Sequence, residues 1–425
     1  MTRDTAPKGN LWQASAAERF EARPLSGTMT VDLAVIGGGF TGLSAALGAA
    51  GQGARVAVLE ARQVGHGGSG RNVGLVNAGL WLPPEGVRRV MGQEAGERLN
   101  RALAGGPDLV FDLIERHGIA CEPQRAGTLH CAHSARGLAD LEDRYRQMKV
   151  MNAPVTLLDG DRTQARTGAR GVYGALHDAR AGTIQPLAYA RGLARAAREA
   201  GARIFEQSPV IEARWSGRSW HVRTAEGSIT ARRLLNATNA YQAPTEGVAL
   251  PAVPVVNFFQ LATEPVPGLA DKVLPGGEGC WDTGLIMTSF RRDLQGRLIL
   301  GAIGLPERGG SLHHDWARRK LRQLFPDHAG AALSHAWSGR ISMTSDHVPK
   351  AMRLEGNGLA IFGYSGRGIA PGTLLGRAAA QALLGDDDEM LPLPVTERMG
   401  GWFSGSRSLY YEAGARLVHF LGARR

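Results

Sequence analysis

Cysteine is scarce in this chain, which has only Cys121, Cys131 and Cys280 among its 425 residues. The odd number and the lack of a CxxC pair indicate reduced thiols and argue against a zinc site. Long apolar runs are also missing. None approaches the roughly 20 residues of a membrane helix, and residues 1–13 lack the apolar core of a signal peptide. We therefore expect a cytoplasmic protein with no membrane span and no metal site.

Lysine is rare as well, although the chain is basic. The 49 Lys and Arg residues against 39 Asp and Glu residues give a net charge of +10, and only five of the cations are lysine. The arginines are dispersed, apart from a run at 318–322 and the terminal pair 424–425. Dispersed arginine in a chain rich in alanine and glycine favours a compositional bias over a nucleic-acid surface. We expect no nucleic-acid partner, and a polyanionic partner remains the minor alternative.

The chain does contain a nucleotide-binding pattern, within residues 32–60. An apolar run leads into the motif Gly37-x-Gly39-x-x-Gly42, a small-residue segment follows, and a second apolar run ends on Glu60. Strand, glycine turn, helix, strand and acid is the order that binds a dinucleotide. Gly39 lets the backbone approach a pyrophosphate at the helix N-terminus. The Glu60 carboxylate can accept both hydroxyls of an adenosine ribose, which disfavours NADP.

Two further motifs indicate which dinucleotide binds. Residues 65–74, GHGGSGRNVG, form a loop that can place backbone N–H groups, Ser69 and Arg71 against an extended cofactor. Residues 363–376 have the sequence GYSGRGIAPGTLLG. Together the motifs resemble those of the FAD-dependent D-amino-acid oxidase superfamily, which includes glycine oxidase, sarcosine oxidase and gamma-glutamylputrescine oxidase. The loop is most similar to that of the last branch.

The resemblance spans nearly the whole chain in scattered blocks and implies an α/β fold. In it, a Rossmann-like FAD-binding domain is interleaved with an α+β substrate domain built on an antiparallel sheet. We expect the FAD-binding domain at 28–90, 185–245 and 335–425, and the substrate-binding or cap domain at 91–184 and 246–334. The residue pattern predicts helices at 187–200 and 312–330, strands at 203–205, 220–223 and 229–235, and a hairpin turn at 293–296.

The resemblance also implies the cofactor, which we expect to be FAD held noncovalently. His66 is similar to the histidine that is linked to flavin in some relatives, but its place in the loop does not match firmly. The expected FAD contacts are Gly37, Gly39, Phe40, Thr41, Gly42, Glu60, Ala61, Arg62, Gly68, Ser69, Arg71, Asn72, Val210, Thr238, Gly363, Gly366, Arg367, Gly368 and Ile369.

A second set of residues is expected around the substrate. For Arg291 the alternative is a solvated cation at a strand end, and for the aromatic residues it is core packing. His313 and its neighbour His314 have no partners at metal-ligand spacing, so we expect a surface pair. The candidate catalytic residues are Arg291, Arg367 and Tyr364, and the candidate substrate-binding residues are Phe290, Trp337 and His347.

Two positions depart from the sarcosine-oxidase pattern. Ile299 stands where that branch has a lysine that promotes reaction with oxygen, and Ala370 stands where it has a carboxylate-binding lysine. The first departure weakens the case for oxygen as the electron acceptor. The second favours an amine or a substrate with a distal carboxylate over an α-amino acid.

These features predict an FAD-dependent enzyme that oxidises the C–N bond of a small amine, N-alkyl amine or amino acid. Hydride transfer to flavin N5 gives an imine that water hydrolyses, and oxygen reoxidises the flavin with hydrogen peroxide as the product. The alternative is a dehydrogenase that passes electrons to a partner protein or a quinone. Minor alternatives are a tRNA-modification flavoprotein and a noncatalytic flavoprotein subunit.

Overall fold

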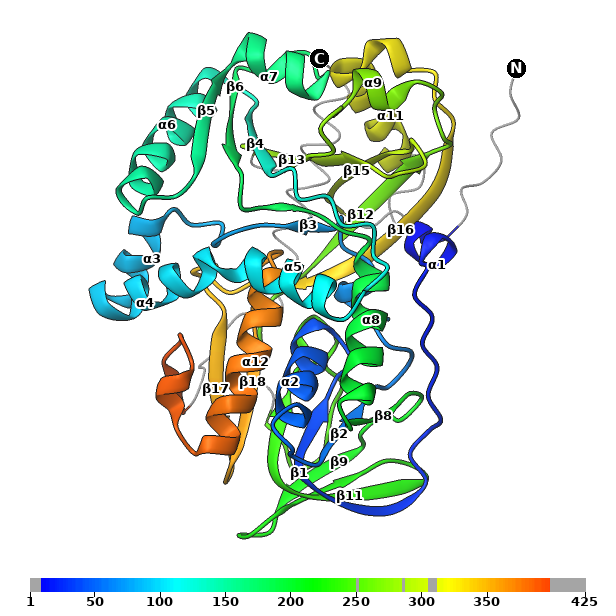
Figure 1. Cartoon of the computed structure of the whole chain (residues 1–425), viewed down its shortest axis with the longest axis vertical. Coiled ribbons are helices and arrows are strands. Elements are labelled where there is room, and N and C mark those ends of the chain that lie inside the picture. The colour runs from blue at the N-terminus through cyan, green and yellow to red at the C-terminus, as the bar shows by residue number, and fades with distance from the viewer. Residues whose placement is uncertain (1–8, 250–251, 285–286, 305–311, 398–425) are drawn as a thin grey trace.

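The computed structural model describes residues 9–249, 252–284, 287–304 and 312–397. Two large sheets divide this part of the chain, one in the lower and one in the upper half of Figure 1. Within the described ranges, no helix combines the length and the apolar character needed to cross a membrane. The last part of the expected FAD-binding domain, 398–425, lies outside the described residues and includes the terminal arginine pair.

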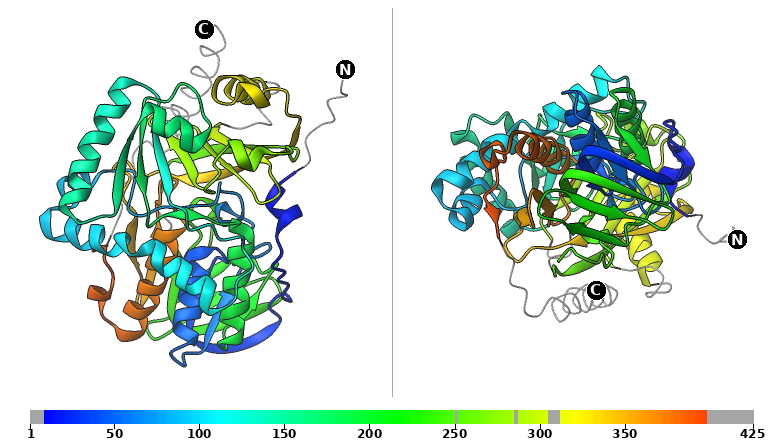
Figure 2. Two further views of the ribbon diagram at one scale, coloured as in Figure 1. Left: turned by 45° about the horizontal axis from the view of Figure 1, so that its top comes forward. Right: turned by 90° about the horizontal axis from the view of Figure 1, so that it is seen from below.

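The first sheet contains nine described strands and has a parallel centre. Its strands are β1 (Gly27–Ile36), β2 (Val56–Leu59), β8 (Arg203–Phe205), β9 (Glu212–Trp215), β10 (Trp220–Arg223), β11 (Gly227–Asn236), β17 (Lys350–Leu354), β18 (Gly358–Phe362) and β19 (Val395–Thr396). The parallel centre has the order β18-β11-β1-β2-β8, so segments far apart in sequence pair side by side (Figure 2). The residues of β2 are all buried, as expected for a parallel strand covered on both faces.

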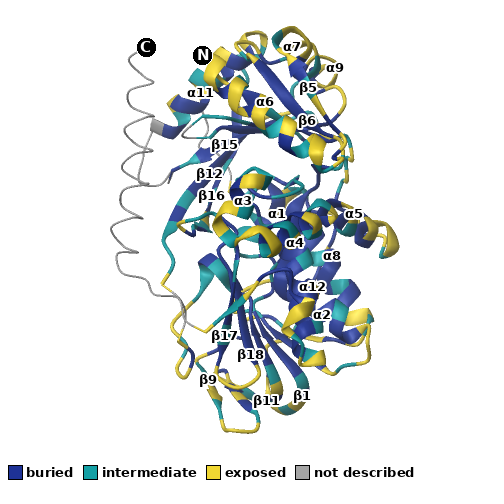
Figure 3. Cartoon of the chain, turned by 90° about the vertical axis from the view of Figure 1, so that its left-hand side faces the viewer, coloured by how far each residue is buried: buried dark blue, intermediate teal, exposed yellow. Residues whose placement is uncertain are grey.

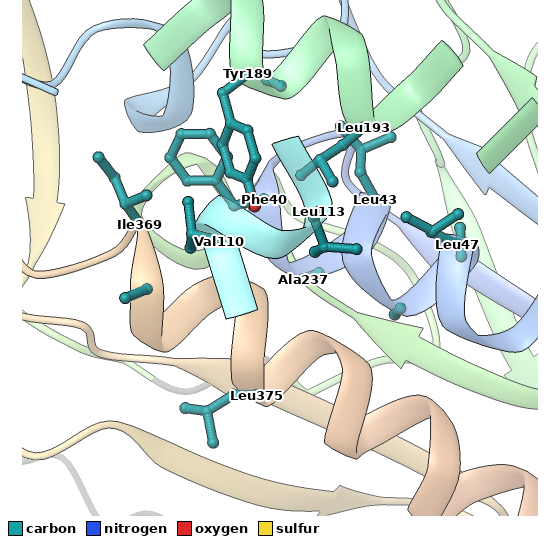
Figure 4. Packing of buried hydrophobic residues seen from close by; sticks show 14 of the residues in the cluster. Phe40, Leu43, Leu47, Val110, Leu113, Tyr189, Leu193, Ala237, Ile369 and Leu375 are labelled. Carbon is teal, nitrogen blue, oxygen red and sulfur yellow. The ribbon is translucent and has the colours of Figure 1, made fainter. Parts of the chain in front are cut away.

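Three helices pack together against the first sheet. They are α2 (Phe40–Ala50), α8 (Pro186–Glu199) and α12 (Ala370–Gly385). Figure 4 shows Phe40 of α2 beside Tyr189 of α8, with ring centroids 5.4 Å apart. Small residues allow the close approach of α12 to α2, because a Cβ at Gly376 would clash with the backbone of Thr41. This packing fixes the N-termini of α2 and α12 next to each other.

The second sheet contains eight described strands and is antiparallel except for one pair. Its order is β16-β12-β15-β14-β13-β4-β6-β5, and β4 runs parallel to β13. In chain order the strands are β4 (Thr128–Ala132), β5 (Val155–Asp159), β6 (Gly174–Asp178), β12 (Val255–Thr263), β13 (Gly279–Asp282), β14 (Ser289–Arg292), β15 (Leu298–Ile303) and β16 (Leu333–Ser342).

Helices at the outer side complete the second half of the molecule. They include α6 (Ala135–Val150), α7 (Gly160–Thr167), α9 (Leu269–Lys272) and α11 (Leu312–Leu324). Figure 3 shows exposed residues on α6 and the buried strand β6 next to it. The remaining elements are α1 (Leu11–Ser15), α3 (Pro84–Met91), α4 (Gln93–Ala104), α5 (Gly106–Arg116), β3 (Leu75–Val76) and β7 (Gly182–Thr183).

Most of the local predictions agree with these elements. The helix at 187–200 and the strands at 203–205, 220–223 and 229–235 are confirmed as α8, β8, β10 and β11. The turn at 293–296 joins the antiparallel strands β14 and β15. The helix expected at 312–330 is shorter. α11 ends at Leu324 because Phe325 precedes a proline and takes an extended φ of −135°.

The expected domain boundaries differ from this arrangement at two places. Helices α4 and α5 lie within 91–184, yet both contact α12, which packs with α2 against the first sheet. Strand β16 lies within 335–425 over most of its length, yet it pairs with β12 of the second sheet. Sequence order alone could not separate these elements, because both domains alternate along the chain.

Candidate active site

The glycine motif forms a tight connection at the carboxyl end of β1. Gly37 has a φ of 110°, a conformation that favours glycine. At Gly39, a Cβ would lie 2.8 Å from Ser69 Oγ. Ser69 Oγ also accepts a hydrogen bond of 3.1 Å from the backbone N–H of Phe40, so the loop 65–74 is attached to the first turn of α2. The N-terminus of α2 therefore faces the space between this turn and the loop, where phosphates are stabilised by free N–H groups.

Glu60 extends from the end of β2 toward the same space. Its Oε2 accepts a hydrogen bond of 2.7 Å from the Gly38 N–H, and its Oε1 accepts one of 2.9 Å from the Arg62 N–H. Burial raises the pKa of Glu60, partly offset by these backbone donors. Each oxygen keeps a second lone pair. The carboxylate can therefore hold the turn in place and still accept ribose hydroxyls.

The loop 65–74 is held by side chains that point away from the cofactor space. Arg71 donates to the His66 carbonyl at 2.8 Å and to the Ser338 carbonyl of β16 at 3.1 Å. The Trp12 ring nitrogen in α1 donates to the Asn72 carbonyl at 2.8 Å. Expected as a direct FAD contact, Arg71 instead lies outside the cavity described next and connects the loop to the second sheet.

A cavity of about 1610 Å³ is lined both by residues of the glycine turn and by residues of the second sheet. Small-ligand sites typically measure about 300–1,000 Å³, so this space exceeds the need of a small substrate alone. At the glycine end its lining includes Gly37, Gly39, Phe40, Thr41, Glu60, Ala61, Arg62, Gly68, Ser69, Asn72, Val210 and Thr238. The lining also includes residues of the second sheet and of the segment before α12, together with Trp81 and His347: Trp81, Gln260, Trp281, Ser289, Ile303, Ile341, His347, Tyr364, Gly366, Arg367, Gly368 and Ile369.

Most of the residues expected to bind FAD line this cavity, and three do not. Gly42 is packed against Gly37, where a Cβ would clash with the backbone. Gly363 donates its N–H to Asn239 Oδ1 at 2.9 Å and so shapes the wall from behind. Arg71 is the third. All three therefore support the walls rather than face the space.

The structure places three of the expected substrate-site residues in the wall of this cavity, namely Tyr364, His347 and Arg367. The Tyr364 hydroxyl forms a 2.7 Å hydrogen bond with Thr41 Oγ1 of α2, which joins the two sides of the cavity. Burial raises the pKa of Tyr364. His347 has a positive φ of 56° and lines the cavity. Arg367 lies in the segment before α12, between the rings of Trp81 and Trp281.

Phe290 and Arg291, expected at the substrate, are absent from the described lining of the cavity. Side chains alternate along β14, so Ser289 faces the cavity while Phe290 packs into the opposite core against Phe325, with ring centroids 5.5 Å apart. Arg291 is 2% exposed, and its Nη1 donates to the Ile184 carbonyl at 2.6 Å. The Arg291 cation is therefore buried among backbone carbonyls and is not a solvated strand-end charge.

Trp337 and His313 also occupy places that differ from the expectation. The Trp337 ring nitrogen donates to the Arg71 carbonyl at 2.8 Å, and the ring packs edge-on against Trp12 at 5.6 Å. This core packing was the alternative interpretation. The prediction that His313 belongs to a surface pair was wrong. His313 is 1% exposed, and the centroid of its ring lies 4.4 Å from that of Phe259. The amphipathic α11 places one histidine of the pair inward.

Sequence reasoning missed several residues of the cavity wall, including Trp81, Gln260 and Trp281. Trp81 and Trp281 belong to no motif. Gln260 had a detectable signal, because it is a polar residue in the middle of the apolar strand β12. Its side-chain Oε1 is buried and has no hydrogen-bond partner among the described residues. A buried polar atom without a partner is rare, which suggests a ligand contact.

A glycine turn, a strand-end acid and a helix N-terminus around one cavity define a dinucleotide-binding α/β protein. The chain belongs to the DAO family of FAD dependent oxidoreductases, whose family model matches residues 32–382. Its cofactor is FAD. The residues present fit this group, because Gly39 has no side chain at the N-terminus of α2, where a pyrophosphate can approach the backbone, and the Glu60 carboxylate lines the same cavity.

The chain is similar to proteins that are named as oxidoreductases or oxidases. The chain is 30% identical over 386 residues to the probable oxidoreductase OrdL of Haemophilus influenzae, which covers 88% of each protein. It is 29% identical to gamma-glutamylputrescine oxidoreductase of Escherichia coli, over 98% of this chain and 100% of that protein. The solved glycine oxidase of Geobacillus kaustophilus has a TM-score of 0.70 at 22% identity, covering 87% of this chain and 100% of the other. This last likeness concerns the fold.

Proposed function

We propose that this enzyme oxidises the C–N bond of a small amine, N-alkyl amine or amino acid and releases the product after hydrolysis of an imine. The observation that carries the proposal is that one cavity is lined both by the glycine turn and by Trp81, Gln260, Trp281 and Tyr364. We call the part lined by these four residues the chamber. Bound FAD supplies a hydride acceptor at N5. The relatives named for gamma-glutamylputrescine and glycine support an amine or amino-acid substrate.

The residues of the chamber suit the binding of an amine in its neutral form. Gln260 Oε1 has no partner among the described residues and can accept a hydrogen bond from the amine N–H. The aromatic residues Trp81, Trp281 and Tyr364 give the chamber an apolar wall. Orientation and removal of water are the contributions that such a reaction needs from the protein. An acid–base pair is not required once the amine has lost its proton.

Anaerobic mixing tests this function. The yellow holoenzyme should bleach with at least one member of a panel of polyamines, N-methyl amino acids and D- and L-amino acids, and the reduction rate should rise with pH as the bound amine loses its proton. Dithionite serves as the chemical control for a reducible flavin. Bleaching by dithionite but by no amine in the panel, at any pH, would contradict the proposal.

We propose oxygen as the electron acceptor, with a dehydrogenase as the second candidate. Ile299 favours the second candidate. Ile299 of β15 is fully buried in a hydrophobic core and is itself absent from the described lining of the cavity, which contains no lysine. A nearby cation stabilises the superoxide anion formed in the first electron transfer to oxygen, and an isoleucine does not.

The dehydrogenase candidate predicts that the reduced enzyme reacts slowly with oxygen. Stopped-flow mixing of the amine-reduced protein with air-saturated buffer should give a lower reoxidation rate than mixing with a soluble quinone at the same concentration. A faster reaction with oxygen would remove the dehydrogenase from consideration. It would then point to Arg367 as the cation, and Arg367→Met should slow that reaction.

A further inference from the structure

A second, smaller cavity of about 70 Å³ adjoins the main cavity, and Trp281 and Arg367 line both. We call it the side cavity. Its volume suffices for a few water molecules or one carboxylate group, but it is well below the roughly 150 Å³ of a cavity that holds a benzene ring. Its lining includes the charged side chains Arg144, Asp178, Arg180 and Arg367. A polar cavity of this size beside a substrate chamber can take one end of the substrate.

Arg367 stands at the boundary between the two cavities with free hydrogen-bonding capacity. Its guanidinium carbon lies 5.0 Å from the centre of the Trp81 ring and 4.6 Å from that of the Trp281 ring. The residue is 7% exposed, and its Nη2 is buried without a hydrogen-bond partner among the described residues. Burial, reinforced by the charge of Arg144, lowers the pKa of Arg367 to about 9, so it remains a cation at neutral pH. The Trp281 Nε1 donor is also without a described partner.

Arg144 adds a second positive charge to the side cavity. Its Nη2 donates to the carbonyls of Leu80 at 3.0 Å and Trp81 at 2.6 Å, which fixes the guanidinium in the wall. The carboxylate of Asp178 is already paired with Arg180 at 2.6 Å. The charged groups that line the side cavity thus carry excess positive charge. The negative charge of Asp178 also acts on Arg144 and Arg367, where it opposes the lowering of their pKa, but one carboxylate cannot balance three guanidinium groups. Buried charges in proteins are paired, so a further anion is expected in the side cavity.

We propose that the side cavity is the subsite for a carboxylate of the substrate, bound by Arg367 and Arg144 and separated by a spacer from the C–N bond that reacts. A carboxylate is planar and matches the guanidinium fork. Arg144 lines only the side cavity, so an anion shared with Arg367 lies outside the chamber where the C–N bond must meet FAD. The substrate class is therefore an amine with a distal carboxylate. The amine part of this inference rests on the proposed function.

Calorimetric titration of the oxidised holoenzyme tests the subsite without any oxidation step. Glutarate should bind to the wild type, and its uncharged analogue glutaramide should not. Arg367→Met and Arg144→Met should each weaken glutarate binding by about tenfold or more, the size of one charge-assisted hydrogen bond. Arg367→Lys should restore part of the affinity. Arg101→Met is the matched control, because it removes an arginine with an 80% exposed side chain from α4. Equal glutarate affinities in Arg367→Met and Arg101→Met, both with full flavin occupancy, would overturn the proposal.

Anaerobic flavin reduction then distinguishes a substrate carboxylate from a free anion. In a series from glycine through 4-aminobutanoate to 6-aminohexanoate, a longer acid should reduce the flavin at lower concentration than its own primary amide. Arg367→Met should remove that difference. If chloride or sulfate displaces glutarate while every acid and its amide act alike, the site binds free anions and the proposal is overturned. If glutarate binding requires Arg367 but no amine bleaches the flavin, the carboxylate subsite stands and amine oxidation is overturned.

Discussion

The Gly39→Val variant should be purified as a folded protein without its yellow colour. Gly39 has a φ of −99° and a ψ of −173°, an extended conformation that valine readily adopts. The new side chain would press on Ser69 Oγ, 2.8 Å from the added Cβ, and would narrow the cavity beside the N-terminus of α2, where we expect the pyrophosphate. We expect FAD affinity to fall by at least about 100-fold, equivalent to about 2.7 kcal/mol. Flavin absorbance per protein and far-ultraviolet circular dichroism measure occupancy and folding separately.

Gly48→Ala is the control for this variant, because it enlarges a glycine within α2, the helix that Gly39 precedes. A Cβ at Gly48 would lie 3.5 Å from Arg377 Cγ, an ordinary contact, and alanine favours a helix over glycine. The control should therefore keep full flavin occupancy. Full occupancy in Gly39→Val as well would show that the pyrophosphate does not pass this residue.

Arg291→Met should lower the free energy of unfolding by about 3 kcal/mol, because buried carbonyls lose a charged donor. Arg291 Nη1 contacts the carbonyls of Ile184 at 2.6 Å and of Gly74 and Val73 at 3.4 Å. Burial lowers the pKa of Arg291 to about 10, so the buried group is charged at neutral pH. Urea unfolding at saturating FAD measures the loss. The relative reduction rates with anionic and neutral amines should stay the same.

Arg292→Met provides the neighbouring control on β14. Arg292 also donates to two carbonyls, those of Leu274 at 2.9 Å and Pro275 at 3.2 Å, but it is only partly buried. Water can replace these bonds, so the loss should stay below about 1 kcal/mol. An unchanged unfolding midpoint in Arg291→Met, together with a selective loss of anionic substrates, would place Arg291 at the substrate.

The nucleotide-binding unit could be predicted from sequence because its signals are local. The turn from Gly37 to Gly42 and the acid at Glu60 lie within 30 contiguous residues, and each has a backbone or charge requirement that few residue types satisfy. The strand-helix-strand order therefore determines where these groups meet. The same reason explains why α8 and β10 were located correctly.

The substrate end of the cavity could not be derived in this way. Trp81, Trp281 and Arg367 come from three distant segments, and only the tertiary fold brings their side chains together. The motif around Arg291 suggested a cation near the substrate. Whether an arginine donates to a ligand or to backbone carbonyls depends on the strand that packs over it, which no local pattern records.

The cavity described above joins residues from the two ends of the chain, and this has a consequence for biosynthesis. Gly39 and Arg367 line the same space, although about 330 residues separate them. At a synthesis rate of roughly 5–20 residues per second, the ribosome makes the segment before α12 roughly 15–70 s after the glycine turn. Until then the buried face of α2 lacks its neighbour α12. The flavin site is complete only when nearly the whole chain has been translated, so the nascent chain needs protection of an apolar helix surface during that interval.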